Sequence, residues 1–229
     1  MNSIFPLPQP VVIPIAGCEE VYPVTRIFCV GRNYAAHARE MGFDPDREPP
    51  FFFTKWASTI VPNHAEICYP SGTDDFHYEG VLVLAIGSRC HNVLPEDAAA
   101  HIFGYGTGLD MTRRDLQIAA RKLGRPWDTG KNFEDSAPVA ALHPVPAVGA
   151  LGGRSLELKV NGERRQFATL DQMIWSCAEI VAHLSRLYQL GPGDLIFTGT
   201  PEGVGAVQRG DTVSVKIEGL TELTISIAS

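Results

Sequence analysis

Apolar residues recur along this chain mostly in short runs that are typical of β-strands. Residues 79–86 are almost continuously apolar, which indicates a strand covered on both faces. Two runs flank Asn161 and Gly162 and predict a β-hairpin with a type I′ turn, whose central positions favour Asn and Gly. The expected strands lie at residues 24–30, 51–53, 79–86, 156–160, 163–167, 194–198, 212–217 and 223–227.

Helical periodicity is confined to a few segments. Asn33 is expected to cap a short helix through Met41, and residues 95–100 fit one or two helical turns. Thr112 is expected to cap a basic amphipathic helix that runs to Leu123. The longest expected helix is capped by Asp171, has apolar residues three and four positions apart, and ends before residue 191. Because these helices do not alternate regularly with the strands, we predict a β-rich α+β fold rather than a doubly wound α/β fold.

The composition is that of a folded globular protein, with 45% hydrophobic and 20% charged residues in a chain of 229. No apolar run is long enough to span a bilayer. Because no internal repeat or low-complexity linker divides the chain, we expect one compact domain at residues 24–229 after a short N-terminal arm at residues 1–23. The net charge of −7 and the absence of a basic tract argue against nucleic acid and anionic membranes as partners.

The five cysteines are scattered, and no two of them form a CxxC motif. This pattern predicts reduced, mostly buried thiols and a cytoplasmic protein. Residues 15–18 (IAGC) look like a lipoprotein cleavage site. However, no Lys or Arg precedes them and prolines interrupt the preceding segment, which argues against an export signal.

A first candidate for chemistry is the pair His37 and Glu40. On a helix, residues three apart lie side by side, so the carboxylate could orient the imidazole as a general base. The same spacing also fits a solvated His–Glu pair on a surface helix.

A second candidate is a pair of carboxylates at strand ends. Glu79 enters an apolar strand, where an ionised side chain is costly unless it is paired or binds a metal. Asp110 follows another apolar stretch and precedes a helix, so it could equally be a capping or loop acid. Two such oxygen ligands would suit Mg²⁺ or Mn²⁺ if they meet.

Two further candidates lie in loops. Lys131 follows a run rich in turn residues, and by itself it also fits an ordinary surface lysine. Gly199-Thr200-Pro201 follows a predicted strand, where backbone N–H groups and a hydroxyl could hold a carboxylate. A simple tight turn explains the same residues.

Taken together and in order, six motifs resemble the fumarylacetoacetate hydrolase (FAH) superfamily, and the resemblance extends from about Val24 to the C-terminus. Residues 39–53 look most like the bacterial fumarylpyruvate hydrolases of gentisate breakdown, an aromatic catabolic route. The acylpyruvase and oxaloacetate decarboxylase branch is close behind. The motifs are VGRNYAAHAREM (30–41), HYE to AIG (77–87), GLDMTRRDLQ (108–117), PW to Lys131 (126–131), KVNG (159–162) and TGTPEGVG (198–205).

The resemblance implies a mixed β-sandwich or roll with a few peripheral helices, usually a homodimer with one Mg²⁺ or Mn²⁺ per site. The implied reaction is hydrolysis of a carbon–carbon bond in a 2,4-dioxo acid, such as fumarylpyruvate or another acylpyruvate. Carried over by motif, the implied roles are His37 and Glu40 as the water-activating dyad, Glu79 and Asp110 as metal ligands, Lys131 as a catalytic residue, and Arg32, Gln117 and Thr200 as substrate contacts.

One position departs from the superfamily pattern. Its metal motif is Glu-x-Glu, whereas this chain has Glu79, Gly80 and Val81, and an isopropyl group cannot bind a metal. Two carboxylates with water and substrate oxygens could still bind the metal, more weakly, and His77 could add a nitrogen ligand. Alternatively, the protein is a catalytically silent binder of oxo acids, or an oxaloacetate decarboxylase or tautomerase on the same scaffold.

Overall fold

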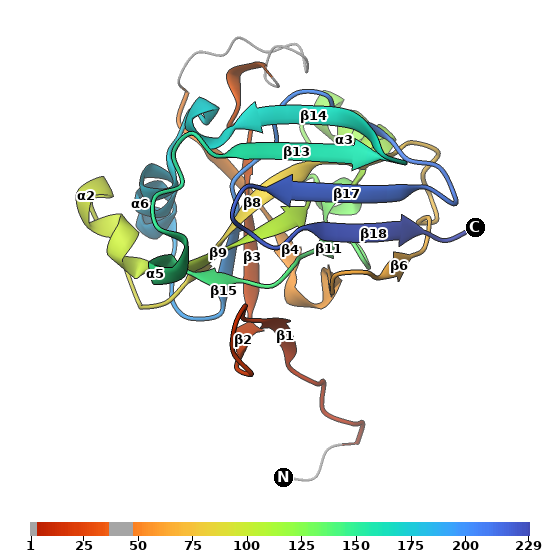
Figure 1. The fold of residues 1–229 in the computed structure, drawn as a ribbon. Coiled ribbons are helices and arrows are strands. Elements are labelled where there is room, and N and C mark those ends of the chain that lie inside the picture. The colour runs from red at the N-terminus through yellow and green to blue at the C-terminus, as the bar shows by residue number, and fades with distance from the viewer. Residues whose placement is uncertain (1–3, 37–47) are drawn as a thin grey trace.

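Two β-sheets stacked face to face form the body of the protein in this computed structural model, which describes residues 4–36 and 48–229 (Figure 1). The larger sheet has the strand order β12 (His143–Pro144), β9 (Ile102–Leu109), β8 (Gly80–Ile86), β15 (Asp194–Phe197), β3 (Arg26–Gly31) and β4 (Phe51–Trp56). The second sheet has the order β14 (Glu163–Thr169), β13 (Ser155–Val160), β17 (Thr212–Ile217), β18 (Leu223–Ile227) and β6 (Glu66–Ile67).

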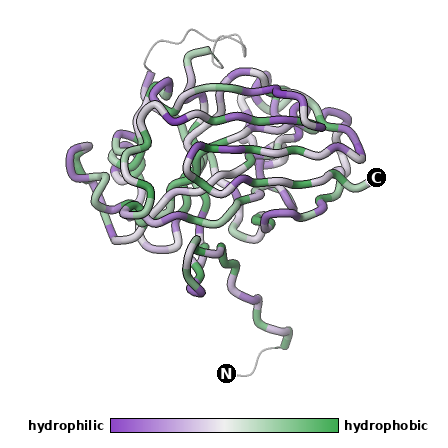
Figure 2. The backbone as a smooth tube through the Cα atoms, in the orientation of Figure 1, coloured by the Kyte–Doolittle hydropathy of each residue, from purple (hydrophilic) through white to green (hydrophobic). Residues whose placement is uncertain are grey.

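The main apolar core lies between these sheets, and β8 is buried along its whole length. Leu82 and Leu84 of β8 belong to that core, whereas Val81 and Val83 join a second apolar cluster. Successive side chains of a strand point to opposite faces, so β8 serves both clusters. Strands β13 and β17 of the second sheet instead alternate buried positions with more accessible ones. Figure 2 shows the hydropathy of the residues along these strands.

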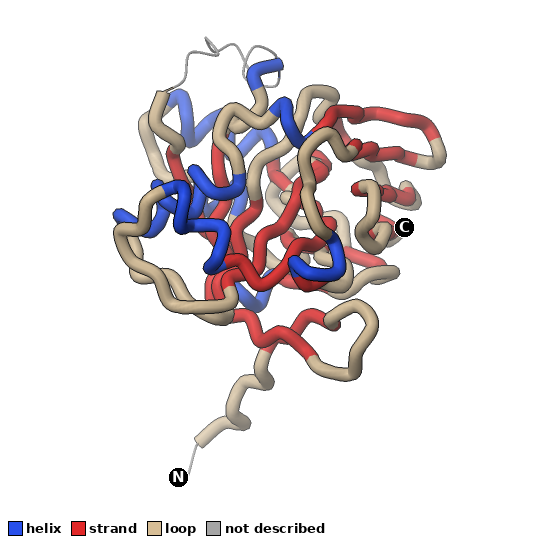
Figure 3. The backbone as a smooth tube through the Cα atoms, turned by 60° about the vertical axis from the view of Figure 1, so that its left-hand side comes forward, coloured by secondary structure: helices blue, strands red, loops and turns tan. Residues whose placement is uncertain are grey.

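Smaller elements surround the two sheets, and the helices lie at the periphery (Figure 3). The remaining strand pairs are β1 (Val11–Pro14) with β2 (Val21–Val24), β10 (Thr112–Arg113) with β7 (Phe76–Tyr78) and β16 (Gly205–Ala206), and β11 (Ala137–Pro138) with β5 (Ile60–Val61). The helices are α2 (Pro95–Ala98), α3 (Arg114–Lys122), α4 (Asp128–Lys131), α5 (Val145–Val148) and α6 (Cys177–Leu187), with 3₁₀ turns η1 (Ala57–Thr59), η2 (Ala99–His101) and η3 (Leu170–Gln172).

The predicted strands are confirmed, most of them to within two residues. The hairpin between β13 and β14 also has the predicted turn, since Asn161 and Gly162 have φ values of 52° and 81°. The buried strand β8 pairs with β9 on one side and with β15 on the other. The β-rich α+β fold class is therefore confirmed.

The predicted helix starts were wrong in two places, because other polar contacts form there. Ser176 and Glu179 form a capping box, so α6 begins at Cys177 rather than after Asp171. Thr112 donates its hydroxyl to the carbonyl of Asp110 instead of capping α3. The side-chain oxygen of Asn33 accepts from Trp175 N at 2.7 Å, and residues 37–41 of the helix that Asn33 was expected to cap lie outside the described residues.

All five cysteines are free thiols, but the prediction that most are buried was only partly correct. Cys29 and Cys90 are buried, whereas Cys18 and Cys68 are exposed. No helix in the described part of the chain is long and apolar enough to cross a membrane.

A close contact between the edge strand β12 and its neighbour β9 gives a test of the fold. A Cβ on Gly104 of β9 would lie 2.4 Å from the backbone oxygen of His143 in β12. Gly104→Ala should therefore lower the free energy of unfolding by about 1–3 kcal/mol, the usual cost of overpacking. Urea denaturation would measure this change.

Gly152→Ala is the matched control, because a Cβ there meets nothing within 4 Å and its φ is not positive. This variant should be neutral or stabilised by up to about 1 kcal/mol through the loss of unfolded-state entropy. Equal effects of the two substitutions would contradict the close packing of β12 on β9.

Candidate active site

Glu79 and Asp110 meet at one end of the larger sheet. The antiparallel pairing of β8 with β9 places Gly80 opposite Leu109, so the residues just outside these partners are neighbours. Their backbones are joined directly, because Asp110 N donates to the carbonyl of Glu79 at 2.8 Å. Both side chains are buried, with 6% and 4% of their residues' surface exposed. The sequence-predicted carboxylate pair is therefore brought together, and Asp110 is not a solvated capping acid.

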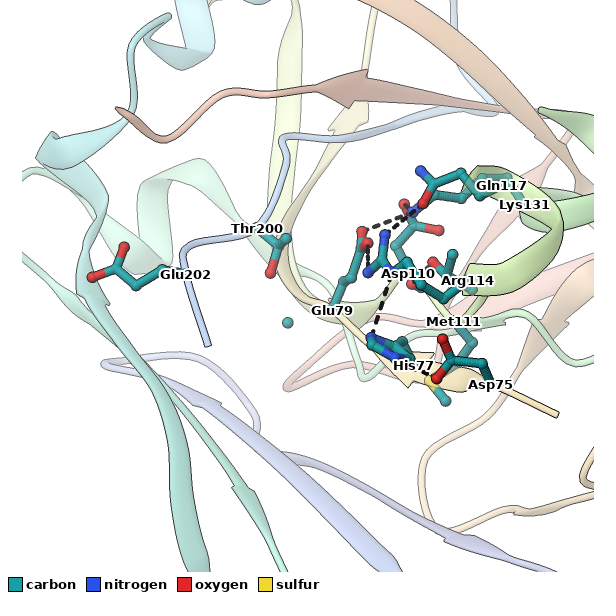
Figure 4. Close-up of polar contacts among 12 residues, drawn as sticks. Asp75, His77, Glu79, Asp110, Met111, Arg114, Gln117, Lys131, Thr200 and Glu202 are labelled. Atoms are coloured by element: carbon teal, nitrogen blue, oxygen red, sulfur yellow. Dashed lines mark hydrogen bonds and ion pairs between the residues drawn. The ribbon is translucent and has the colours of Figure 1, made fainter. Parts of the chain in front are cut away.

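Lys131 bridges the two carboxylates (Figure 4). Its Nζ lies 2.8 Å from Glu79 Oε2 and 2.8 Å from Asp110 Oδ2, and the residue is only 2% exposed. The residue ends α4, which packs closely on α3, because a Cβ on Gly130 would lie 2.8 Å from Gln117 N. Lys131 is thus a buried counter-charge and not a surface lysine.

A second buried cation, Arg114 of α3, pairs with the other oxygen of Glu79. Its guanidinium lies 2.7 Å from Glu79 Oε1 and also donates to Gln117 Oε1. The same group donates to His77 Nδ1 at 3.4 Å, while His77 Nε2 is 2.8 Å from Asp75. Burial and the charge of Arg114 lower the pKa of His77. Both ring nitrogens are therefore engaged, which speaks against His77 as a metal ligand.

A third buried cation, Lys55 of β4, lies on the far side of Asp110. Its Nζ is 3.0 Å from Asp110 Oδ1 and donates to the carbonyl oxygens of Met111 and Lys131. Burial lowers the pKa of Lys55, and the charge of Asp110 opposes this shift. The two oxygens of Asp110 therefore pair with different ammonium groups, Oδ1 with Lys55 and Oδ2 with Lys131.

A solvent-open cavity leads to this cluster. Its inner end is formed by Glu79, Arg114 and Lys131, and its sides include Gln117 and Thr200. Arg32, which has a left-handed φ of 58°, also faces the cavity. The structure describes six of the residues predicted from the sequence as metal, catalytic or substrate contacts. Five of them line this cavity, and the sixth, Asp110, contacts Lys131 at its inner end. The predicted His37 and Glu40 lie outside the described residues.

Two buried amides that sequence reasoning missed hold this site together. Gln166 of β14 accepts from Gly80 N at 2.9 Å and donates to Thr200 Oγ1 at 2.9 Å. Asn33 donates to the carbonyl of Thr198 at 2.9 Å, at the end of β15. These amides connect the loop that contains Thr200 to the strands around it. Their partners are distant in sequence, so no local pattern could have identified them.

The chain belongs to the fumarylacetoacetate hydrolase family, because the model of that family, described as "Fumarylacetoacetate (FAA) hydrolase C-terminal", matches residues 26–228. A fumarylpyruvate hydrolase from Ralstonia sp is 46% identical over 184 residues, which cover 80% of this chain and 95% of that protein. An oxaloacetate tautomerase from Escherichia coli strain K12 is 37% identical over 199 residues, which cover 86% and 90%.

A solved structure agrees with this assignment. The crystal structure of fumarylpyruvate hydrolase from Pseudomonas aeruginosa in complex with Mn²⁺ and pyruvate superimposes with a TM-score of 0.96. The two chains are 52% identical, and the match covers 99% of each. The family resemblance expected from the six motifs is therefore confirmed, as is the mixed-sheet fold that it implied.

The buried ion cluster predicts a strong stability effect of Lys131. Lys131→Met leaves Glu79 and Asp110 without the ammonium that bridges them, and the free energy of unfolding should fall by about 3–5 kcal/mol. Lys122→Met is the control, because Lys122 is exposed on the neighbouring helix and its loss should cost less than about 0.5 kcal/mol. Urea denaturation of both variants at neutral pH tests the prediction, which fails if Lys131→Met is as stable as the control.

Proposed function

We propose that this protein is an enzyme of the fumarylpyruvate hydrolase type, which cleaves a carbon–carbon bond in a 2,4-dioxo acid with water. The observation that carries the proposal is the convergence of two buried carboxylates and three buried cations at the inner end of the cavity. The similarity to fumarylpyruvate hydrolases from Ralstonia sp and Pseudomonas aeruginosa supports it.

The site fits a divalent metal, with a smaller set of protein ligands than the superfamily motif supplies. One ammonium touches both Glu79 and Asp110, so the two carboxylates already converge on a single cation position. Within residues 4–36 and 48–229, no three His, Cys, Asp or Glu side chains gather to hold a metal by themselves. We propose that Glu79 and Asp110 hold Mg²⁺ or Mn²⁺ weakly, with water and substrate oxygens as the other ligands.

Bound there, such a metal would supply Lewis-acid stabilisation of the substrate's 2-oxo oxygen. In the proposed mechanism, His37, oriented by Glu40, takes a proton from water, and the water oxygen adds to the distal carbonyl carbon. The bond between carbons 3 and 4 then breaks, and its electron pair stays on the pyruvate fragment as an enolate. Lys131 and Arg114 stabilise this negative charge. Protonation of carbon 3 gives pyruvate, and the acyl group leaves as a carboxylic acid.

Gln117 and Thr200 would orient the oxo acid in this scheme. Both line the cavity beside Glu79 and are almost fully buried. Each is itself held by a neighbour, Gln117 by Arg114 and Thr200 by Gln166. Rigid contacts of this kind position the reacting carbons without costing rotamer entropy during the reaction.

A second candidate is keto–enol tautomerisation of oxaloacetate, the activity named for the relative from Escherichia coli. The excess of cations over carboxylates around Glu79 favours it, because an enolate needs positive charge but no hydrolytic water. Product analysis distinguishes the candidates, since only hydrolysis yields pyruvate and a second acid. A homodimer, a cytoplasmic location and a place in gentisate breakdown stay predictions from the sequence.

The smaller ligand set predicts that metal and oxo acid bind cooperatively. Pyruvate would complete the metal's oxygen shell and would add negative charge among three buried cations. The dissociation constant of Mn²⁺, measured by electron paramagnetic resonance, should therefore fall at least tenfold in saturating pyruvate. By linkage, the dissociation constant of pyruvate should fall by the same factor in saturating Mn²⁺. Propionate, which lacks the 2-oxo group, is the control. The same Mn²⁺ affinity with and without pyruvate would count against the proposed ligand set.

Val81 should limit metal binding in the absence of substrate. Val81 lies two residues after Glu79, which is the spacing of one strand face, and it belongs to the second apolar cluster, which also contains Cys29. Val81→Glu adds a carboxylate toward the cluster of cations, so Mn²⁺ without pyruvate should bind at least tenfold more tightly. Val81→Gln, of the same length but neutral, should not gain affinity. If Val81→Glu folds, by its melting temperature, and gains nothing, the assignment of position 81 to the metal site is wrong.

A further inference from the structure

The outer half of the cavity carries a second concentration of positive charge. Arg32 and Arg121 line the cavity and also line the groove that continues from it toward solvent. Neither belongs to the buried ion cluster, which consists of Glu79, Asp110 and their three cations.

The two guanidiniums act on each other. Burial lowers the pKa of Arg32, and the positive charge of Arg121 lowers it further, while Glu48 raises it. The Arg32 guanidinium also lies 5.2 Å from the centroid of the Phe51 ring, which limits the directions it can take. Two cations that repel each other at the mouth of a cavity are favourably placed for an anion that binds to both.

The space between the inner cluster and these arginines is mostly apolar. Phe53, Ile118 and Trp127 line it, and the rings of Phe53 and Trp127 are 5.7 Å apart. The cavity therefore presents cations at its inner end, apolar walls in the middle and cations at its outer end. This order of charged and apolar walls is complementary to a molecule with a carboxylate at each end of a carbon chain.

Helix α3 determines the distance between the two ends. Arg114, Gln117 and Arg121 all face the cavity, and their spacing of three and four residues is that of one helix face. The rise from Arg114 to Arg121 is about 10 Å, at about 1.5 Å per residue. The two carboxylates of a seven-carbon 2,4-dioxo diacid are six carbon–carbon bonds apart, which is a length of the same order.

We infer that Arg121, together with Arg32, binds the distal carboxylate of the substrate and makes the enzyme selective for diacids over acylpyruvates with an uncharged acyl end. This inference rests on the proposed function and deepens it, because it names the second half of the substrate. Arg121 is a specificity-determining residue in this scheme, and it takes no part in bond cleavage.

The test is a binding measurement with two 2-oxo acids of equal length, 2-oxopimelate and 2-oxoheptanoate, which differ only in the distal carboxylate. Isothermal titration in the presence of Mn²⁺ should give a preference of at least tenfold for the diacid with the native protein, as expected for one charge-assisted contact. Arg121→Gln should reduce this preference to less than threefold, and it should leave the affinity for 2-oxoheptanoate unchanged.

Lys122→Gln is the matched control, because it removes the same charge from the adjacent, exposed position of α3 and does not face the cavity. This variant should keep the full preference. If the native protein binds both acids equally, or if Arg121→Gln keeps the preference, the inference is overturned while oxo-acid binding stands. If neither acid binds to the native protein, the proposed function fails and the inference fails with it.

Discussion

Lys131 holds two buried carboxylates together, and the arrangement of the site follows from this contact. Glu79 and Asp110 lie almost fully buried at the ends of paired strands, where a carboxylate is costly without a partner. The pairing of β8 with β9 places the two carboxylates side by side, and the packing of α4 on α3 positions the ammonium of Lys131. The charged groups are thus held in place by the fold before a ligand binds. Preorganised groups of this kind can stabilise charge that develops in a transition state.

The balance of charge around this contact bears on the metal binding proposed above. Lys55, Lys131 and Arg114 surround two carboxylates, so the cluster carries more positive than negative side chains. A divalent cation that enters must compete with Lys131 for the same oxygens. In the proposed metal site, Val81 in place of the superfamily's Glu would shift this competition toward the lysine, and the negative charge of a bound oxo acid would shift it back.

Local sequence patterns predicted the elements of the fold better than their ends. Continuous and alternating apolar runs predicted the strands, and Asn161-Gly162 predicted its turn, because these signals act within a few residues. The start of α6 was missed, because the capping box of Ser176 and Glu179 outweighs the earlier Asp171. The roles of the site residues came from family motifs, whereas Gln166 was missed because its partners are 86 and 34 residues away.

One helix face contacts both halves of the cavity, and this has a consequence for how relatives with other substrates could arise. Side chains return to the same face of a helix only after three or four residues, so an anchor on α3 moves outward in steps of about 5.4 Å. An anchor moved from position 121 to position 120 or 122 would be rotated by about 100°, and neither of those positions lines the cavity. The length of substrate that such a pocket accepts would therefore change in steps of about one helical turn. A relative with its anchoring residue one turn further along α3 would bind a substrate that is longer by about that step.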